Sequence, residues 1–168
     1  MRKYLLDSNI FIQAYRMHYP FDVVPSLWDK LIKLSDNGVI LSIDKVKKEL
    51  FSNNDELSRW CKSRLRNTFF VDTENCINKY IDITKWANSH PRYELRAKEE
   101  FLQADLADPW LVAYAMTERE HKNDCIIVTH EKSQPNTGKK IKIPEVCNQF
   151  KIKHTNLIEM FREIGETF

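Results

Sequence analysis

Residues 108–129 read DPWLVAYAMTEREHKNDCIIVT and contain the clearest secondary-structure signals in the chain. Asp108 is a residue type that caps helices, and Pro109 follows at the position where proline best fits a first helical turn, which predicts a helix from 109 to about 118. The run CIIVT at 125–129 is apolar throughout, as expected of a strand whose two faces are both covered. A strand of this kind next to a helix predicts a parallel sheet packed between helices.

The rest of the chain repeats this alternation of short apolar runs and helical segments. The other predicted strands are 3–6, 39–41, 69–71 and 152–155. The predicted helices are 10–17, 25–34, 42–50 (capped by Ser42), 55–66, 73–88, 94–102 and 156–163. The polar segment 133–142 receives no assignment. Strands that alternate with helices predict an α/β fold, formed here by one domain over residues 1–168.

Composition narrows the class of protein. With 168 residues the chain fits one domain, and its net charge of +2 is not the broad basic surface of a protein that binds duplex nucleic acid by charge alone. The start MRKYLLDSN lacks a signal-peptide pattern, and no apolar run approaches the roughly 20 residues that cross a bilayer. The four cysteines form no C-x-x-C pair, which argues against a zinc site. We expect a soluble, cytoplasmic protein without membrane contact.

Four acidic residues lie where a parallel sheet places its functional groups, outside the carboxyl ends of the strands. Asp7 ends the first predicted strand, Glu131 follows the fourth, and Asp108 opens the helix before it. Glu49 lies roughly 60° around its helix from the apolar Val46, at the edge of the buried stripe. Carboxylates gathered from several elements suit a hard cation such as Mg²⁺. The sequence therefore predicts a divalent-cation site.

Each acid also has a simpler interpretation. Asp7 and Asp108 are good helix N-caps, Glu49 fits a solvated helix surface, and Glu131 fits an ordinary loop charge. Asp105, in the same connection as Asp108, competes with Glu131 as the fourth ligand.

Basic and aromatic residues near these acids are candidates for substrate contact. The basic residues are Lys45, Lys47 and Lys48 beside Glu49, and Lys132, Lys139 and Lys140 after Glu131. Of these, Lys45, Lys48 and Lys132 are the main candidates to position phosphates, with a solvated surface as the alternative. Trp110 is either a packing residue or a platform on which a base stacks. His130 and His18 have no spacing that marks a catalytic base.

Four segments resemble, in this order and spacing, the PIN-domain nucleases: YLLDSNIFI (4–12), IDKVKKEL (43–50), ADPWLVAYA (107–115) and IIVTHE (126–131). The resemblance covers nearly the whole chain and implies a three-layer fold with a parallel sheet in the order 3-2-1-4-5. Carried over, the metal-binding and catalytic acids are Asp7, Glu49, Asp108 and Glu131, supported by Ser8, Asn9 and Thr129. Glu131 departs from the family pattern, in which an Asp is common there.

The resemblance also implies an activity. It is the hydrolysis of single-stranded RNA by water activated on Mg²⁺ or Mn²⁺. Many small members are similar to this chain and act as toxins of toxin–antitoxin modules (VapC-type), which implies an antitoxin partner and a homodimer. A non-catalytic domain that binds RNA or protein, and a DNA nuclease with the same metal site, are the alternatives. A haloacid-dehalogenase-like phosphatase is disfavoured because Asn9 stands where it needs a second Asp.

Overall fold

The computed structural model describes residues 2–167, and one central sheet organises them. Its strands are β1 (Lys3–Leu6), β2 (Ile40–Ile43), β3 (Phe70–Val71), β4 (Cys125–Val128) and β5 (His154–Thr155). All neighbours are parallel, and the order is β3-β2-β1-β4-β5. Both the fold class and the strand order confirm the prediction from sequence.

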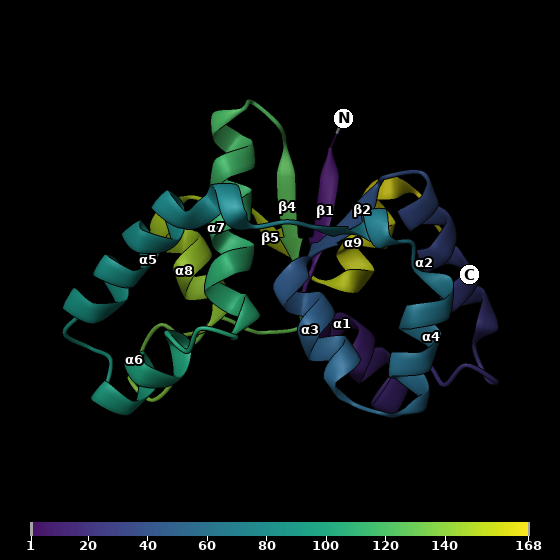
Figure 1. Ribbon diagram of the computed structural model, residues 1–168, viewed down its shortest axis with the longest axis horizontal. Helices are drawn as coiled ribbons and strands as arrows, with labels where there is room; N and C mark the ends of the chain where they lie inside the picture. The colour runs from purple at the N-terminus through teal and green to yellow at the C-terminus, as the bar shows by residue number, and fades with distance from the viewer. Residues whose placement is uncertain (1, 168) are drawn as a thin grey trace.

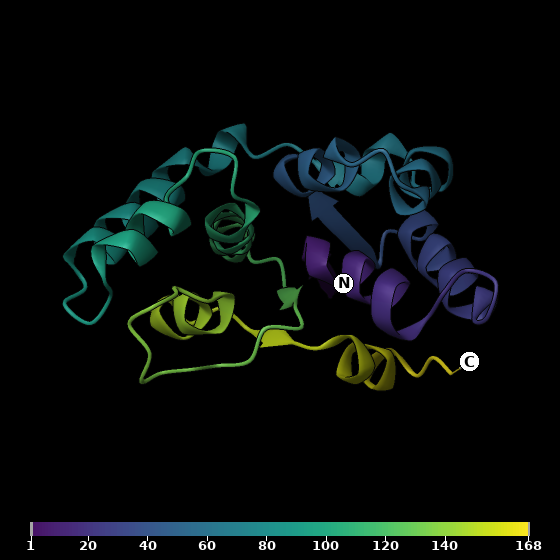
Figure 2. The same ribbon diagram turned by 90° about the horizontal axis from the view of Figure 1, so that it is seen from below.

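Helices cover both faces of this sheet. They are α1 (Ser8–Gln13), α2 (Pro25–Asp36), α3 (Asp44–Ser52), α4 (Glu56–Arg64), α5 (Ile77–Ser89), α6 (Leu95–Phe101), α7 (Ala107–Glu120), α8 (Ile143–Phe150) and α9 (Leu157–Ile164). Helices α7 and α8 lie on one face with α5 and α6 outside them, and α1, α2 and α9 lie on the other (Figures 1 and 2). None of the helices within residues 2–167 has the length and apolar character that a membrane crossing needs.

The two central strands are buried on both faces, as their apolar sequences predict. Leu5 and Leu6 of β1 and Ile127 and Val128 of β4 are inaccessible to solvent. Because all strands run in one direction, their carboxyl ends share one edge of the sheet. That is the lower edge in Figure 1 and the edge that faces the viewer in Figure 2. Functional groups placed at strand ends therefore meet at this edge.

Two predicted helix caps are wrong. Ser42 does not begin a helix but lies inside β2, where its Oγ donates a hydrogen bond of 2.6 Å to the carbonyl oxygen of Leu6. The helix after it begins at Asp44. Asp108 is not the cap of α7, because that helix begins one residue earlier at Ala107 and Asp108 belongs to its first turn.

One further helix, which the sequence did not predict, directly follows the unassigned polar segment 133–142. Helix α8 spans Ile143–Phe150, and Ile143, Val146 and Cys147 are buried at helical spacing. Pro144 occupies its first turn, where proline fits.

Other predicted boundaries shift without changing the topology. The predicted helix 10–17 is α1 followed by a π-helical turn at Ala14–His18. The predicted helix 73–88 starts as a 3₁₀ turn, Glu74–Cys76, before α5. The last strand shortens from 152–155 to His154–Thr155. Such differences are usual at the ends of elements.

Candidate metal centre

The four predicted acids converge at the carboxyl edge of the sheet. Glu49 of α3, Asp108 of α7 and Glu131 after β4 line one hollow of about 450 Å³ together with Ser8 and Asn9. Asp7, directly after β1, is buried beside it, close enough for the charges of Glu131 and Glu49 to act on it. The acids thus come from four separate segments of the chain.

Asp7 is the most deeply buried of the four acids. Only 1% of it is exposed, and the hydroxyl of Thr129 donates a hydrogen bond of 3.0 Å to its Oδ2. The Ser8 hydroxyl lies 3.4 Å from Oδ1. Although Asp7 stands at the cap position of α1, its side chain forms no cap hydrogen bond. Its carboxylate therefore contacts both the end of β4, through Thr129, and the start of α1, through Ser8.

Burial and mutual repulsion raise the pKa values of Asp7 and Asp108. Burial, and next the charge of Glu131, raise the pKa of Asp7 to about 6. Burial, and next the charge of Asp7, raise the pKa of Asp108 well above its usual range. Both shifts disfavour the ionised forms, since like charges are held together away from water. The site therefore has more negative charge than its own partners neutralise.

Glu49 connects two elements of the site. Its Oε1 accepts a hydrogen bond of 3.0 Å from the backbone N–H of Ala107, the first residue of α7. Glu49 thus satisfies a free N–H at the start of the helix that carries Asp108. It is half-buried and bonded, rather than a freely solvated helix residue.

Glu131 and Asp105 have very different surroundings. The Glu131 side chain is 11% exposed, and its Oε2 accepts a hydrogen bond of 2.7 Å from the N–H of Ile143. Its Oε1 lies 3.2 Å from the ammonium of Lys140. The Asp105 side chain is 89% exposed and has only Lys48, at 4.0 Å, as an ionic partner within residues 2–167. Of the two competitors, Glu131 is the one beside the other acids.

The donor atoms suit a hard cation, although the side chains are not arranged around one. Among residues 2–167, no group of three or more His, Cys, Asp or Glu side chains stands in a geometry that could hold a metal ion. The reason is visible in the contacts, because Glu49 and Glu131 both turn toward backbone N–H groups. The acids that line the hollow offer carboxylate oxygens, and no His or Cys lines it within the described residues. This donor chemistry fits Mg²⁺ or Mn²⁺.

Two of the predicted substrate contacts serve packing instead. Trp110 stacks on Tyr80 with ring centroids 4.1 Å apart. The ammonium of Lys45 lies 5.2 Å from the Trp110 ring and 3.6 Å from Asp44, and its side chain is only 19% exposed. Neither Lys45 nor Trp110 is therefore placed as a free contact for a phosphate or a base.

Of the other lysines predicted to contact substrate, some lie outside the acidic hollow and one lines it. Lys48 is exposed near Asp105, and Lys132 lines a neighbouring hollow rather than the acidic one. Lys140, which the sequence did not distinguish from its neighbour Lys139, is the one Lys or Arg of the described residues that lines the acidic hollow. Burial lowers the pKa of Lys140, but the charge and hydrogen bond of Glu131 together with the charges of Asp108 and Asp7 outweigh it, so that the pKa is raised. No local pattern singles it out, because residues 129–139 separate it from β4.

Comparison with known proteins gives a family but no characterised relative. A search among curated proteins finds no match. The profile of one family, described as a domain of unknown function (DUF4411), matches residues 4–168, and the chain therefore belongs to this family.

Proposed function

We propose that this protein is a metal-dependent nuclease that hydrolyses single-stranded RNA. The observation that carries the proposal is the convergence of Asp7, Glu49, Asp108 and Glu131, from four segments, on one hollow at the carboxyl edge of the sheet. The choice of RNA comes from the resemblance of the site's segments to the PIN-domain nucleases.

Energetics support a role for these acids beyond stability. An acid whose pKa is raised by burial destabilises the folded protein at neutral pH, so an ordinary core would exclude it. Perturbed acids in a hollow are typical of functional sites. When bound, Mg²⁺ or Mn²⁺ would activate a water molecule and stabilise the charge that develops on a phosphate.

The chain's own residues then act in defined ways. Asp7 and Asp108 would hold the cation, and the Thr129 and Ser8 hydroxyls would keep the Asp7 carboxylate in place. Glu49 and Glu131 would exchange their backbone N–H partners for the cation or its waters. The hydrogen bond between Glu49 and Ala107 also fixes α7 relative to α3, and with it the position of Asp108.

A cleavage assay tests the proposal. A labelled single-stranded RNA, a single-stranded DNA of the same sequence and an RNA duplex are incubated with the protein in Mg²⁺, Mn²⁺ or EDTA. We expect cleavage of the single-stranded RNA that needs the metal, is lost in Asp7→Asn and is retained in Asp105→Asn, a matched change at an exposed acid.

Other outcomes favour the alternatives. Equal cleavage of DNA would make the protein a general single-strand nuclease. Binding of RNA without cleavage in either metal would favour a non-catalytic domain. Growth arrest of a bacterial host by the wild type, but not by Asp7→Asn, would support a toxin role.

A further inference from the structure

A second hollow adjoins the acidic one at the same edge of the sheet. It measures about 580 Å³ and lies between residues 129–133, which follow β4, and residues 154–156 with Ile158, where β5 leads into α9. Glu131 lines both hollows. A chain molecule bound across Glu131 would therefore occupy both.

The second hollow has fewer carboxylates than the first. Glu131 is the one carboxylate among its described lining residues, and Lys132 contributes an exposed ammonium. Lys132 forms no ion pair or hydrogen bond within residues 2–167. This hollow can therefore contact a negatively charged group through Lys132 without a metal ion.

Two imidazoles in this hollow have unused hydrogen-bonding capacity. His130 and His154 are both half-buried, and neither imidazole makes a side-chain hydrogen bond or a ring contact with another described residue. A neutral imidazole offers one donor and one acceptor, and its flat face can stack on a base. Half-buried polar rings without a protein partner point to a ligand or to water.

The walls of the hollow are fixed rather than loose. The Ser133 hydroxyl and the backbone N–H of Gln134 both donate to Oε1 of Glu145, at 2.6 and 2.7 Å. On the sheet, the Thr129 N–H donates to the carbonyl oxygen of Thr155 at 3.0 Å. The two histidines therefore stand on neighbouring strand ends with a set spacing.

We propose that this hollow is a nucleotide subsite, which binds the nucleotide next to the scissile phosphate of an RNA strand. Lys132 contacts its phosphate, His130 and His154 contact its base or sugar, and Ile158, which is 43% exposed, covers an apolar face of the base. The inference rests on the proposed function for the choice of RNA, but binding at this subsite needs neither metal nor cleavage.

The five histidines of the chain allow a direct test by NMR. The imidazole proton signals are followed while AMP or UMP is added in EDTA. We expect the signals of His130 and His154 to shift with saturation, and those of the exposed His121 and of His90, directly after the distant helix α5, to stay in place. No saturable shift at His130 and His154, or an equal shift with inorganic phosphate at the same concentration, overturns the nucleotide subsite.

Variants connect the subsite to cleavage. His154→Ala and Lys132→Ala should raise the KM for a short single-stranded RNA about tenfold each and leave kcat within about twofold. The controls His121→Ala and Lys85→Ala, at exposed residues outside both hollows, should match the wild type. If the NMR shifts occur but no variant or wild type cleaves RNA, the proposed function fails and the subsite stands. If the wild type cleaves and all four variants equal it, the subsite is wrong and the proposed function stands.

Discussion

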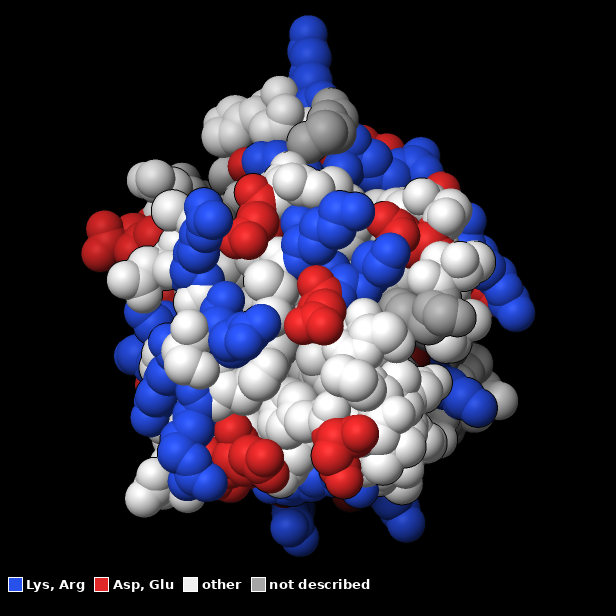
Figure 3. Space-filling view, turned by 90° about the vertical axis from the view of Figure 1, so that its right-hand side faces the viewer, with Lys and Arg blue, Asp and Glu red and all other residues white. Residues whose placement is uncertain are grey.

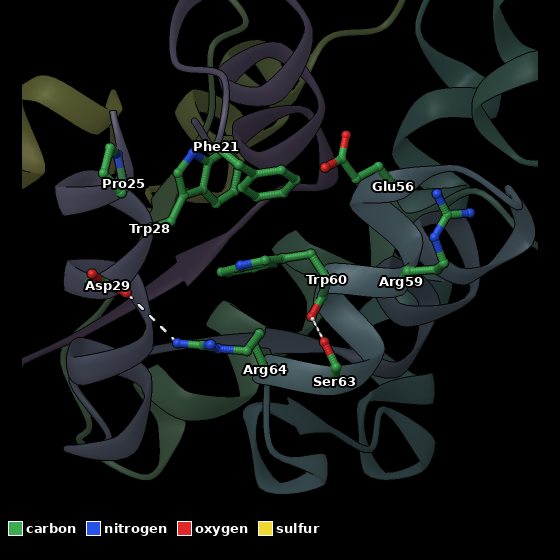
Figure 4. A pocket seen from close by; sticks show the side chains of 9 residues that line it. All are labelled: Phe21, Pro25, Trp28, Asp29, Glu56, Arg59, Trp60, Ser63 and Arg64. Carbon is green, nitrogen blue, oxygen red and sulfur yellow. Dashed lines mark hydrogen bonds and ion pairs between the residues drawn. The ribbon is translucent and has the colours of Figure 1, made fainter. Parts of the chain in front are cut away.

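The acidic hollow and the hollow between α2 and α4 differ in whether their charged side chains are buried or exposed. The second is lined by Phe21, Trp28 and Trp60, with Phe21 and Trp28 centroids 4.4 Å apart and Trp28 and Trp60 centroids 4.9 Å apart (Figure 4). Its charges stand at the rim, where Arg64 lies 3.7 Å from Asp29 and both are exposed. In the acidic hollow the charges of Asp7 and Asp108 are buried.

This difference indicates that the aromatic hollow stabilises the fold, whereas the acidic hollow serves a chemical function. Aromatic rings that pack on each other remove apolar surface from water and stabilise the fold. On the face that carries α2 and α4, positive and negative side chains are interspersed (Figure 3). The buried acids of the other hollow instead oppose folding, which is expected of a site built for a ligand.

The largest expected effect is on catalysis. Asp108→Asn should reduce RNA cleavage about a thousandfold, which corresponds to about 4 kcal/mol in the barrier. The thermal midpoint should stay equal or rise, since a buried charge is removed. Cleavage kinetics and a thermal melt are measured together, with Asp105→Asn as the control. A folded Asp108→Asn variant with wild-type turnover would remove Asp108 from the site.

The aromatic hollow should show the reverse. Trp28 is 2% exposed, and its indole N–H donates to the carbonyl oxygen of Tyr19 at 2.8 Å. Trp28→Ala should lower the free energy of unfolding by roughly 3–5 kcal/mol. Cleavage per folded molecule should not change. Trp60→Ala, at a half-buried ring of the same cluster, should lower the free energy of unfolding by less. If Trp28→Ala lost activity per folded molecule as well as stability, the aromatic hollow would not be separate from the catalytic site.

The sequence predicted the parts of the structure that depend on pattern and strand direction. The apolar run 125–129 contains β4, which ends one residue earlier at Val128, and the alternation of elements predicted the parallel sheet. Three of the acids could be named because parallel strands end at one edge, and Glu49 could be named from its place at the edge of the apolar stripe of its helix; the resemblance to PIN-domain nucleases supported all four. Their contacts follow from the fold and not from any one segment.

The errors have a common physical origin, because local residue preferences compete with distant partners. Ser42 is a good cap by type, but its hydroxyl bonds a carbonyl 36 residues away. Helix α8 is only eight residues long, and its buried Glu145 bonds the preceding loop, which masks its apolar pattern. The role of Lys140 depends on the course of that loop. Gly138 shows how tightly it packs, since a Cβ there would lie 2.3 Å from the carbonyl oxygen of Arg92.

A pH series sharpens the comparison through Asp7. Its pKa is raised to about 6 in the folded protein, against about 4 when unfolded. The folded state therefore binds the proton more tightly, and stability is gained as pH falls from about 7 toward 4. In EDTA, this contribution should amount to roughly 2–3 kcal/mol.

Chemical denaturation at several pH values measures it, as the difference between the wild type and Asp7→Asn. The difference between the two proteins is needed because burial also lowers the pKa of His130 and His154. Their protonation destabilises the folded protein as pH falls, in the wild type and the variant alike. If the free energies of unfolding of the two proteins changed with pH in parallel, the ionisation of Asp7 would not destabilise the folded protein.

The smallest expected effect concerns Lys140, the one described cation that lines the acidic hollow. Its ammonium faces Glu131 at 3.2 Å and would repel a bound divalent ion, although 57% of its side chain is exposed to solvent. Lys140→Met should therefore tighten Mn²⁺ binding about threefold to tenfold, at most about 1.4 kcal/mol. The change in folding stability should stay below about 1 kcal/mol, as for other exposed ion pairs. Calorimetric titration with Mn²⁺ measures the affinity, and Lys139→Met is the matched control. Weaker Mn²⁺ binding in Lys140→Met alone would mean that Lys140 instead holds Glu131 in the position that the ion requires.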